Sequence, residues 1–152
     1  MSNGRVFLKY WLPVALWMAV IFAASTSAGT FQHSSRIIGP LLHWFFPNMA
    51  EGTVNTVVFA VRKCAHMTEY AVLALLLWRA MWKPQSNDTR PWSWPTARNA
   101  ILFTALYAMT DEIHQLFVAD RQGQFIDVVI DTTGATLGLV FNWLLWLWRK
   151  KW

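Results

Sequence analysis

The sequence contains few charged residues and only one cysteine. Asp, Glu, Lys and Arg make up 14% of its 152 residues, whereas a soluble domain usually contains about 25%. The single cysteine, Cys64, excludes a disulfide within the chain and gives no information on the redox compartment. There is also no internal repeat and no low-complexity tract. The shortage of charge argues against a soluble globular domain.

Apolar residues are abundant instead, at 55% of the chain with 11 Trp and 10 Phe. They are concentrated in long segments, and about 20 apolar residues suffice for a helix to cross a bilayer. We therefore predict an all-α fold class, a polytopic integral membrane protein that forms one domain over residues 1–152. The second transmembrane helix is expected to begin ahead of its span, near Thr53. Four transmembrane helices are expected, over residues 10–28, 63–82, 97–118 and 125–148.

The first apolar segment allows a second interpretation. Arg5 and Lys9 precede it and small residues end it, so it also has the features of a cleaved signal peptide. The three later spans require membrane integration in either case. The following loop contains an apolar stretch, Ile37 to Phe46, which is too short to span. We expect it to form a short interfacial or re-entrant helix in the first outer loop.

The distribution of Lys and Arg predicts the orientation, because cytoplasmic loops carry an excess of both residues. The termini and the polar loop at 83–95, with its flanks, carry nine of the 13 basic residues. Both termini are therefore expected in the cytoplasm. The net charge of +5 follows this segregation by membrane side, so no nucleic acid partner is expected. The basic residues on the opposite side are Arg36, Arg62, Lys63 and Arg121.

Three polar groups of residues lie at the ends of the spans that are predicted to face outward. They are residues 63–70, residues 111–115 with Arg121 close behind, and residues 127–132. Ionisable side chains at membrane depth are costly and usually have a partner or a function. With this topology, all three groups meet on the outer side of the membrane.

Helical spacing predicts which side chains converge. Asp127 and Asp131 lie one turn apart on a stripe with Gly134 and Gly138, and this GxxxG pattern lets another helix approach closely. The two aspartates are therefore expected to point into the bundle. On the other helices, the residues expected to share a face are Lys63, His66 and Tyr70, with Glu69 beside them, and Asp111, His114 and Gln115, with Glu112 beside them.

These residues have a structural and a functional interpretation. The structural one is a network of ion pairs and hydrogen bonds that only joins the helices, since buried charges require partners. The functional one is a polar pocket whose excess carboxylates are completed by a proton, a cation or a ligand. The pairs His66/Glu69 and Asp111/His114 have the spacing of metal ligands on two helices, so a metal ion is one possible cofactor. Two basic side chains nearby would repel such an ion. No other cofactor is expected.

The polar segments, taken together, resemble the VanZ-like family of bacterial membrane proteins. Ser25, at the end of the first span, also fits, and the resemblance covers roughly residues 11–145. Asp131 stands where asparagine is expected, and Asp120 stands where a glycine often precedes the arginine. The matching segments are residues 62–71 (RKCAHMTEYA), residues 110–118 (TDEIHQLFV) with Arg121, and residues 127–135 (DVVIDTTGA) with Gly138.

The resemblance implies a multi-pass protein of the bacterial cytoplasmic membrane, in a family named for a member linked to glycopeptide (teicoplanin) resistance. Three hypotheses follow. The first is a module that binds the headgroup of a membrane lipid or a cell-wall precursor. The second is an enzyme that acts on such a headgroup. The third is a structural or transport-related protein whose polar residues only hold helices together.

In the enzyme hypothesis, His66 or His114 would be a general base oriented by a carboxylate. A Ser-His-Asp hydrolase is disfavoured, because no nucleophile elbow surrounds Ser25. The oligomeric state is not predicted. The candidate catalytic residues are Glu112, His114, His66 and Asp111, and the candidate ligand-binding residues are Lys63, Glu69, Tyr70, Gln115, Arg121, Asp127, Asp131 and Ser25.

Overall fold

A computed structural model describes residues 3–26, 31–84, 90–118 and 124–150. Every regular element within these ranges is a helix, which confirms the predicted all-α class. The longest helix has 32 residues and begins close to Thr53, as predicted. In chain order the helices are α1 (Asn3–Ala24), α2 (Phe31–Phe45), α3 (Glu51–Trp82), α4 (Trp94–Gln115) and α5 (Phe125–Lys150).

Two of these helices are long and apolar enough to cross a membrane, namely Gly4–Ala24 in α1 and Phe125–Lys150 in α5. Helices α3 and α4 cover most of the two middle spans that we predicted, but neither meets the same criterion of length and composition. Charged residues within both helices lower their hydropathy. The prediction of four transmembrane helices is therefore supported for the first and last helices and stays a prediction for α3 and α4.

Local sequence explains where α3 ends and α4 begins. Lys83 ends α3 in the left-handed conformation, with a φ of 50°, and its amide donates to Arg79 O at 2.9 Å. The next residue, Pro84, cannot continue the helix. Ser93 then caps α4, because its side chain accepts a hydrogen bond from the Thr96 amide at 3.3 Å. The polar loop at 83–95 is thus bounded by specific stop and start signals.

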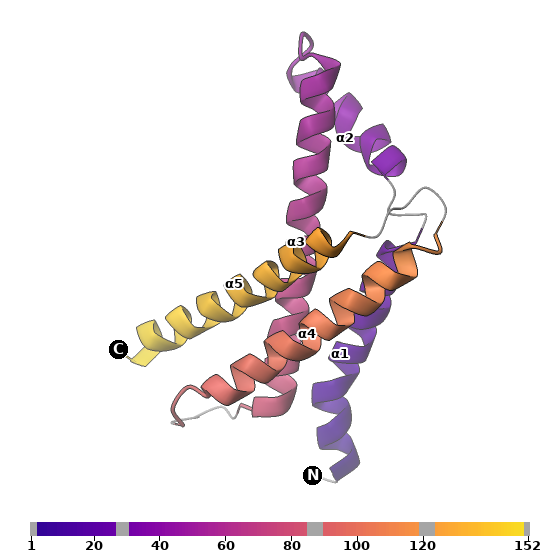
Figure 1. The fold of residues 1–152 in the computed structure, drawn as a ribbon. Helices are drawn as coiled ribbons and strands as arrows, with labels where there is room; N and C mark the ends of the chain where they lie inside the picture. Colours follow the sequence, from indigo (N-terminus) through magenta and orange to yellow (C-terminus); the bar gives the residue numbers. More distant parts are fainter. Residues whose placement is uncertain (1–2, 27–30, 85–89, 119–123, 151–152) are drawn as a thin grey trace.

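Helix α3 is the centre of the fold and contacts α1, α2, α4 and α5. Figure 1 shows α2 beside the N-terminal part of α3 and α5 crossing α3 near its middle. Two glycines permit this crossing. A Cβ atom added at Gly134 would lie 2.7 Å from the Cα of Met67, and one added at Gly138 would lie 2.9 Å from the Cβ of Ala71. The GxxxG stripe therefore packs on α3, as predicted.

Many large apolar side chains lie on the surface of the helices. Leu16 of α1 is 59% exposed, Ile37 of α2 is 74% exposed and Phe141 of α5 is 60% exposed. Helix α2 begins earlier than the apolar stretch that predicted it and ends one residue before it. Extensive exposed apolar surface is unusual on a soluble monomer and marks a surface that another apolar phase or a partner covers.

Candidate functional site

The carboxylate of Asp111 joins three helices. Its Oδ2 atom accepts hydrogen bonds from Ser25 Oγ at 2.7 Å, from Tyr70 OH at 3.1 Å and from Gln115 Nε2 at 3.1 Å. These donors come from the end of α1, from α3 and from α4 itself, and all four side chains are buried. The Oδ1 atom of Asp111 is buried without a hydrogen-bond partner among the described residues. Asp111 therefore holds the helices together and still has one open acceptor.

Helix α5 contributes Asp127 and Asp131, one turn apart. Asp127 Oδ1 forms an ion pair with Lys63 Nζ of α3. Asp131 is 2% exposed, and in the described part of the chain its Oδ2 atom has no hydrogen-bond partner. It lies near enough to Glu112, Asp127 and Asp111 to interact electrostatically with all three. Both aspartates thus face the bundle, and the three polar groups meet as predicted.

We call this assembly the polar cluster; it consists of Ser25, Lys63, Tyr70, Asp111, Glu112, Gln115, Asp127 and Asp131. Glu112 lies at its edge, between α4 and the start of α5. The Glu112 Oε2 atom accepts a hydrogen bond from the backbone amide of Gln124 at 2.8 Å. Glu112 also lines a pocket of about 200 Å³. Apart from Glu112 and Gln124, the residues that line this pocket are apolar, namely Met109, Ile113, Leu116, Phe125 and Val128.

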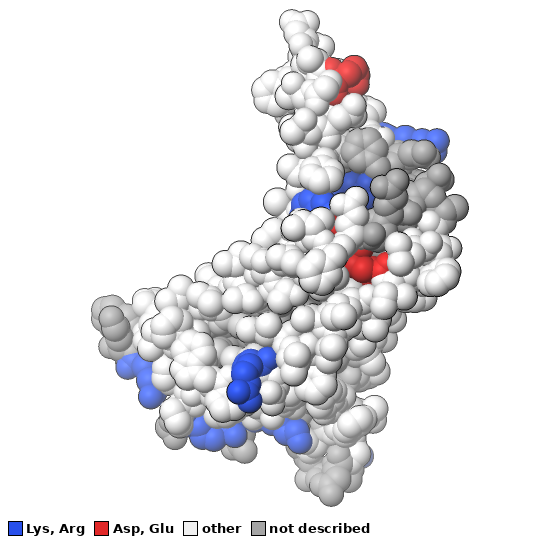
Figure 2. All heavy atoms as spheres, in the orientation of Figure 1, with Lys and Arg blue, Asp and Glu red and all other residues white. Residues whose placement is uncertain are grey.

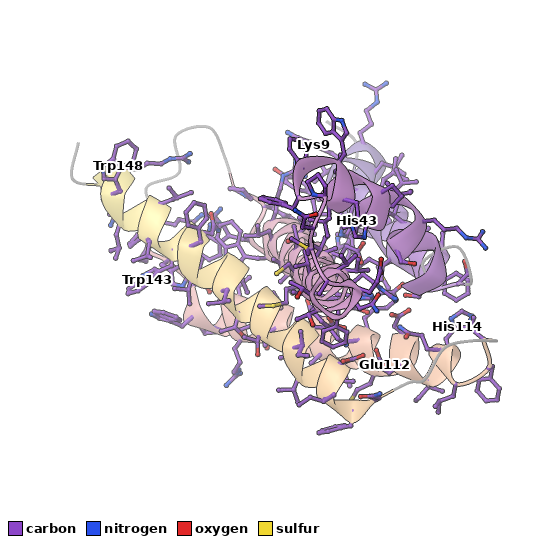
Figure 3. All side chains as sticks on the ribbon, turned by 90° about the horizontal axis from the view of Figure 1, so that it is seen from above. Lys9, His43, Glu112, His114, Trp143 and Trp148 are labelled. Atoms are coloured by element: carbon purple, nitrogen blue, oxygen red, sulfur yellow. The ribbon has the colours of Figure 1, made fainter. Side chains whose placement is uncertain are left out.

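The two candidate catalytic histidines, His66 and His114, make different contacts from those that helical spacing predicts. The ring of His114 packs on Phe22 of α1 at 4.4 Å between centroids, and its Nδ1 atom is buried without a partner among the described residues. Figure 3 shows Glu112 on the α5 side of α4 and His114 on the α1 side. His66 Nδ1 lies 4.0 Å from Glu69 Oε2, which is too long for a hydrogen bond. The side chains of Asp111 and His114 therefore have different neighbours, although they lie one turn apart on α4.

Two further expectations concern a metal ion and Arg121. In residues 3–26, 31–84, 90–118 and 124–150, no group of three or more His, Cys, Asp or Glu side chains could hold a metal ion. The pairs His66/Glu69 and Asp111/His114 do not come together there as a ligand set. Arg121 lies outside the described residues, so its place beside the polar cluster stays a prediction.

Aromatic hydrogen bonds that we did not predict attach α1 to the helices of the polar cluster. Tyr107 OH donates to Met18 O at 2.7 Å, and Trp17 Nε1 donates to Glu69 O at 2.9 Å. Tyr107 precedes Asp111 by one helical turn, a spacing that could have singled it out. Trp17 had no such signal in a chain with 11 tryptophans.

A family model described as VanZ/LLP1 matches residues 10–148. The chain belongs to the VanZ/LLP1 family. The matched range contains every residue of the polar cluster in this VanZ/LLP1 protein, and it confirms the resemblance that the three polar segments indicate. Searches of curated proteins and of solved structures gave no match.

Proposed function

We propose that this VanZ/LLP1 protein crosses the bacterial cytoplasmic membrane four times, through α1, α3, α4 and α5, with α2 at the outer interface. The apolar lengths of α1 and α5 and the exposed apolar side chains support this placement. On the face drawn in Figure 2, most Lys and Arg side chains lie toward the end that carries the termini, and the Asp and Glu side chains lie toward the other end. By the excess of basic residues in cytoplasmic segments, both termini are cytoplasmic and the polar cluster faces outward.

The function that the geometry supports best is binding of a headgroup from an envelope lipid or a cell-wall precursor. The observation that carries this proposal is the pair of buried acceptors, Asp111 Oδ1 and Asp131 Oδ2, which have no hydrogen-bond partner among the described residues. Buried acceptors without partners are destabilising, so proteins rarely retain them without a ligand, water or ion. A headgroup with hydroxyl or amino groups would supply the missing donors.

The surroundings of these acceptors suit a lipid. The small pocket beside Glu112 has apolar walls, and two of its residues, Leu116 and Phe125, are 63% and 78% exposed. An acyl or prenyl chain could lie there while its headgroup reaches the acidic side chains. Lys63 pairs with Asp127 at the same site. Lys63 and Arg121 are the basic side chains expected to neutralise the negative charge of a phosphate.

One observation favours an enzyme as a second candidate. The separation of His66 Nδ1 and Glu69 Oε2, at 4.0 Å, would allow a hydrogen bond after a small movement of either side chain. A histidine oriented in this way could serve as a general base. The third candidate, a cluster that only joins helices, is favoured by the three hydrogen bonds that Asp111 accepts.

Asp131→Leu separates binding from a purely structural role. The substitution removes the open acceptor and keeps the number and branching of the side-chain heavy atoms. Glu51→Leu, the matched control, removes an 80% exposed carboxylate outside the cluster, one that pairs with His43. Binding of phosphatidylethanolamine, whose headgroup offers amino donors, is compared with that of phosphatidylcholine, which offers none. The wild-type protein and the control should prefer phosphatidylethanolamine, and Asp131→Leu should lose about tenfold in that preference, or roughly 1.4 kcal/mol.

The same experiment tests the alternatives. A cell-wall precursor with a polyprenyl pyrophosphate anchor is the second probe. If neither this precursor nor phosphatidylethanolamine binds better than phosphatidylcholine, headgroup binding is refuted. If Asp131→Leu instead lowers the melting temperature strongly, the side chain is structural. Loss of turnover without loss of binding in His66→Gln would favour the enzyme.

A further inference from the structure

A second pocket lies at the opposite end of the bundle from the polar cluster. Its volume is about 380 Å³, and it opens between the end of α3, the segment before α4 and the end of α5. Trp82 is about 18 Å from Tyr70 along α3, at about 1.5 Å per residue, so the two sites are separate. Figure 3 likewise shows Trp148 at the far end of α5 from Glu112. We call it the tryptophan pocket; the residues that matter are Trp78, Trp82, Arg90, Trp92, Arg149 and Lys150.

The tryptophan pocket is basic. Arg90, Arg149 and Lys150 line it, and no acidic side chain does so among the residues that the structure describes. Two of these cations lie over indole rings, since the Arg90 guanidinium is 4.3 Å from the Trp82 centroid and Lys150 Nζ is 4.6 Å from the Trp146 centroid. Arg90 also donates to the carbonyl oxygens of Trp82 and Lys83, each at 3.2 Å, which fixes it at the end of α3. Contacts within the fold therefore hold two of the three cations, Arg90 and Lys150, beside the pocket.

The same pocket contains donors without acceptors. Trp78 and Trp92 stack at 5.0 Å between centroids, and both line the pocket. The indole Nε1 atoms of both residues are buried and have no hydrogen-bond partner in the part of the chain that the structure describes. Trp92 is only 9% exposed. A ligand that offers negatively charged oxygens would supply acceptors for these two indole donors beside the basic side chains.

We infer that the tryptophan pocket binds the phosphate of an anionic membrane phospholipid. Phosphate oxygens are strong acceptors for arginine, lysine and indole N–H groups. Tryptophan and basic residues are also typical of the membrane interface. A lipid is favoured over a soluble phosphate because Trp92 of the pocket also lines an adjoining, mostly apolar groove of about 620 Å³, with Ile101 and Leu102, which offers a surface for acyl chains. This inference does not depend on what the polar cluster binds.

The test uses the full chain in detergent, titrated with phosphatidylglycerol or phosphatidylcholine and followed by native mass spectrometry. The wild-type protein should bind phosphatidylglycerol about tenfold more tightly than phosphatidylcholine. Arg149→Gln combined with Lys150→Gln should remove most of this preference, and both residues are exposed at a helix end, so the fold should persist. Arg5→Gln with Lys9→Gln is the control, because it removes the same charge from exposed positions of α1 outside the pocket.

Each result distinguishes a specific binding site from non-specific attraction of anionic lipid by the net positive charge of the protein. Equal losses in the two double variants would mean that only net charge matters, and the proposal would fail. Displacement of phosphatidylglycerol by an equal concentration of glycerol 3-phosphate would identify a soluble-phosphate site instead. Trp92→Phe keeps an aromatic ring, though a smaller one, and removes the indole N–H, so it should weaken phosphatidylglycerol binding severalfold. Arg149→Gln with Lys150→Gln should remove the same share of the preference in the wild-type and the Asp131→Leu backgrounds, which separates the pocket from the polar cluster.

Discussion

Replacement of Asp111 by alanine tests whether one carboxylate holds α1, α3 and α4 together. The variant leaves the Ser25 hydroxyl, the Tyr70 hydroxyl and the Gln115 amide without the acceptor that they share. All three donors are buried, so water does not readily replace the lost oxygen. The loss should appear in the free energy of unfolding.

The expected size follows from the number of hydrogen bonds. Side-chain hydrogen bonds within membrane bundles contribute about 0.6 kcal/mol on average and up to about 1.7 kcal/mol each. Three such bonds to Asp111 therefore correspond to roughly 2–5 kcal/mol. Removal of the open Oδ1 atom offsets part of this loss, which favours the lower end of the range. For a chain of this size we expect the melting temperature to fall by about 5 °C or more.

Thermal unfolding in detergent, followed by circular dichroism, is a suitable assay. Thr110→Ala is the matched control, because Thr110 is the adjacent exposed residue and its hydroxyl donates within α4, to Tyr107 O at 2.7 Å. Tyr70→Phe should cost about one third as much as Asp111→Ala and nothing further in the double variant. If Asp111→Ala melts within a degree of the control, or the two changes add fully, the shared-acceptor argument is wrong.

Three other outcomes are expected. Topology reporters fused to the C-terminus and within the loop at 83–95 should both report cytoplasm, and an external signal from either would overturn the four-span topology. Glu112→Gln, which can still accept the bond from the Gln124 amide, should abolish headgroup binding or change an envelope phenotype such as glycopeptide susceptibility while the melting temperature stays near that of the wild type; a loss that only tracks the folded fraction would make Glu112 structural. Gly134→Ala should destabilise the fold by about 1–3 kcal/mol, because its Cβ would meet the α3 backbone, whereas Gly4→Ala, with nothing within 4 Å, should not.

The helical class and the inward position of Asp127 and Asp131 could be predicted from the sequence because both depend on local periodicity. Apolar run length identified α1 and α5, and the GxxxG stripe identified the face of α5 that packs on α3. The contacts of His114 could not be predicted in this way. Spacing along α4 places His114 near Asp111, but the ring rotates toward Phe22 because α1 supplies an apolar surface there.

Other features escaped prediction for a different reason. The bond from the Gln124 amide to Glu112 uses a backbone donor, which every residue except proline has and which no sequence pattern marks. The tryptophan pocket combines residues from three separate segments, and no local spacing in the sequence relates them. Only the fold shows that they enclose a space with basic side chains.

The ion pair between Lys63 and Asp127 also has a consequence for biogenesis. The two residues are 64 positions apart in the chain, and synthesis proceeds from the N-terminus. Lys63 is therefore made, and α3 leaves the ribosome, well before its carboxylate partner exists. Asp111, which lies between them in the chain, likewise emerges before Asp127 and Asp131. In the proposed four-span topology, the nascent chain must then keep a charged α3 near water or the translocation machinery until α5 is made, so α5 completes the membrane integration of α3.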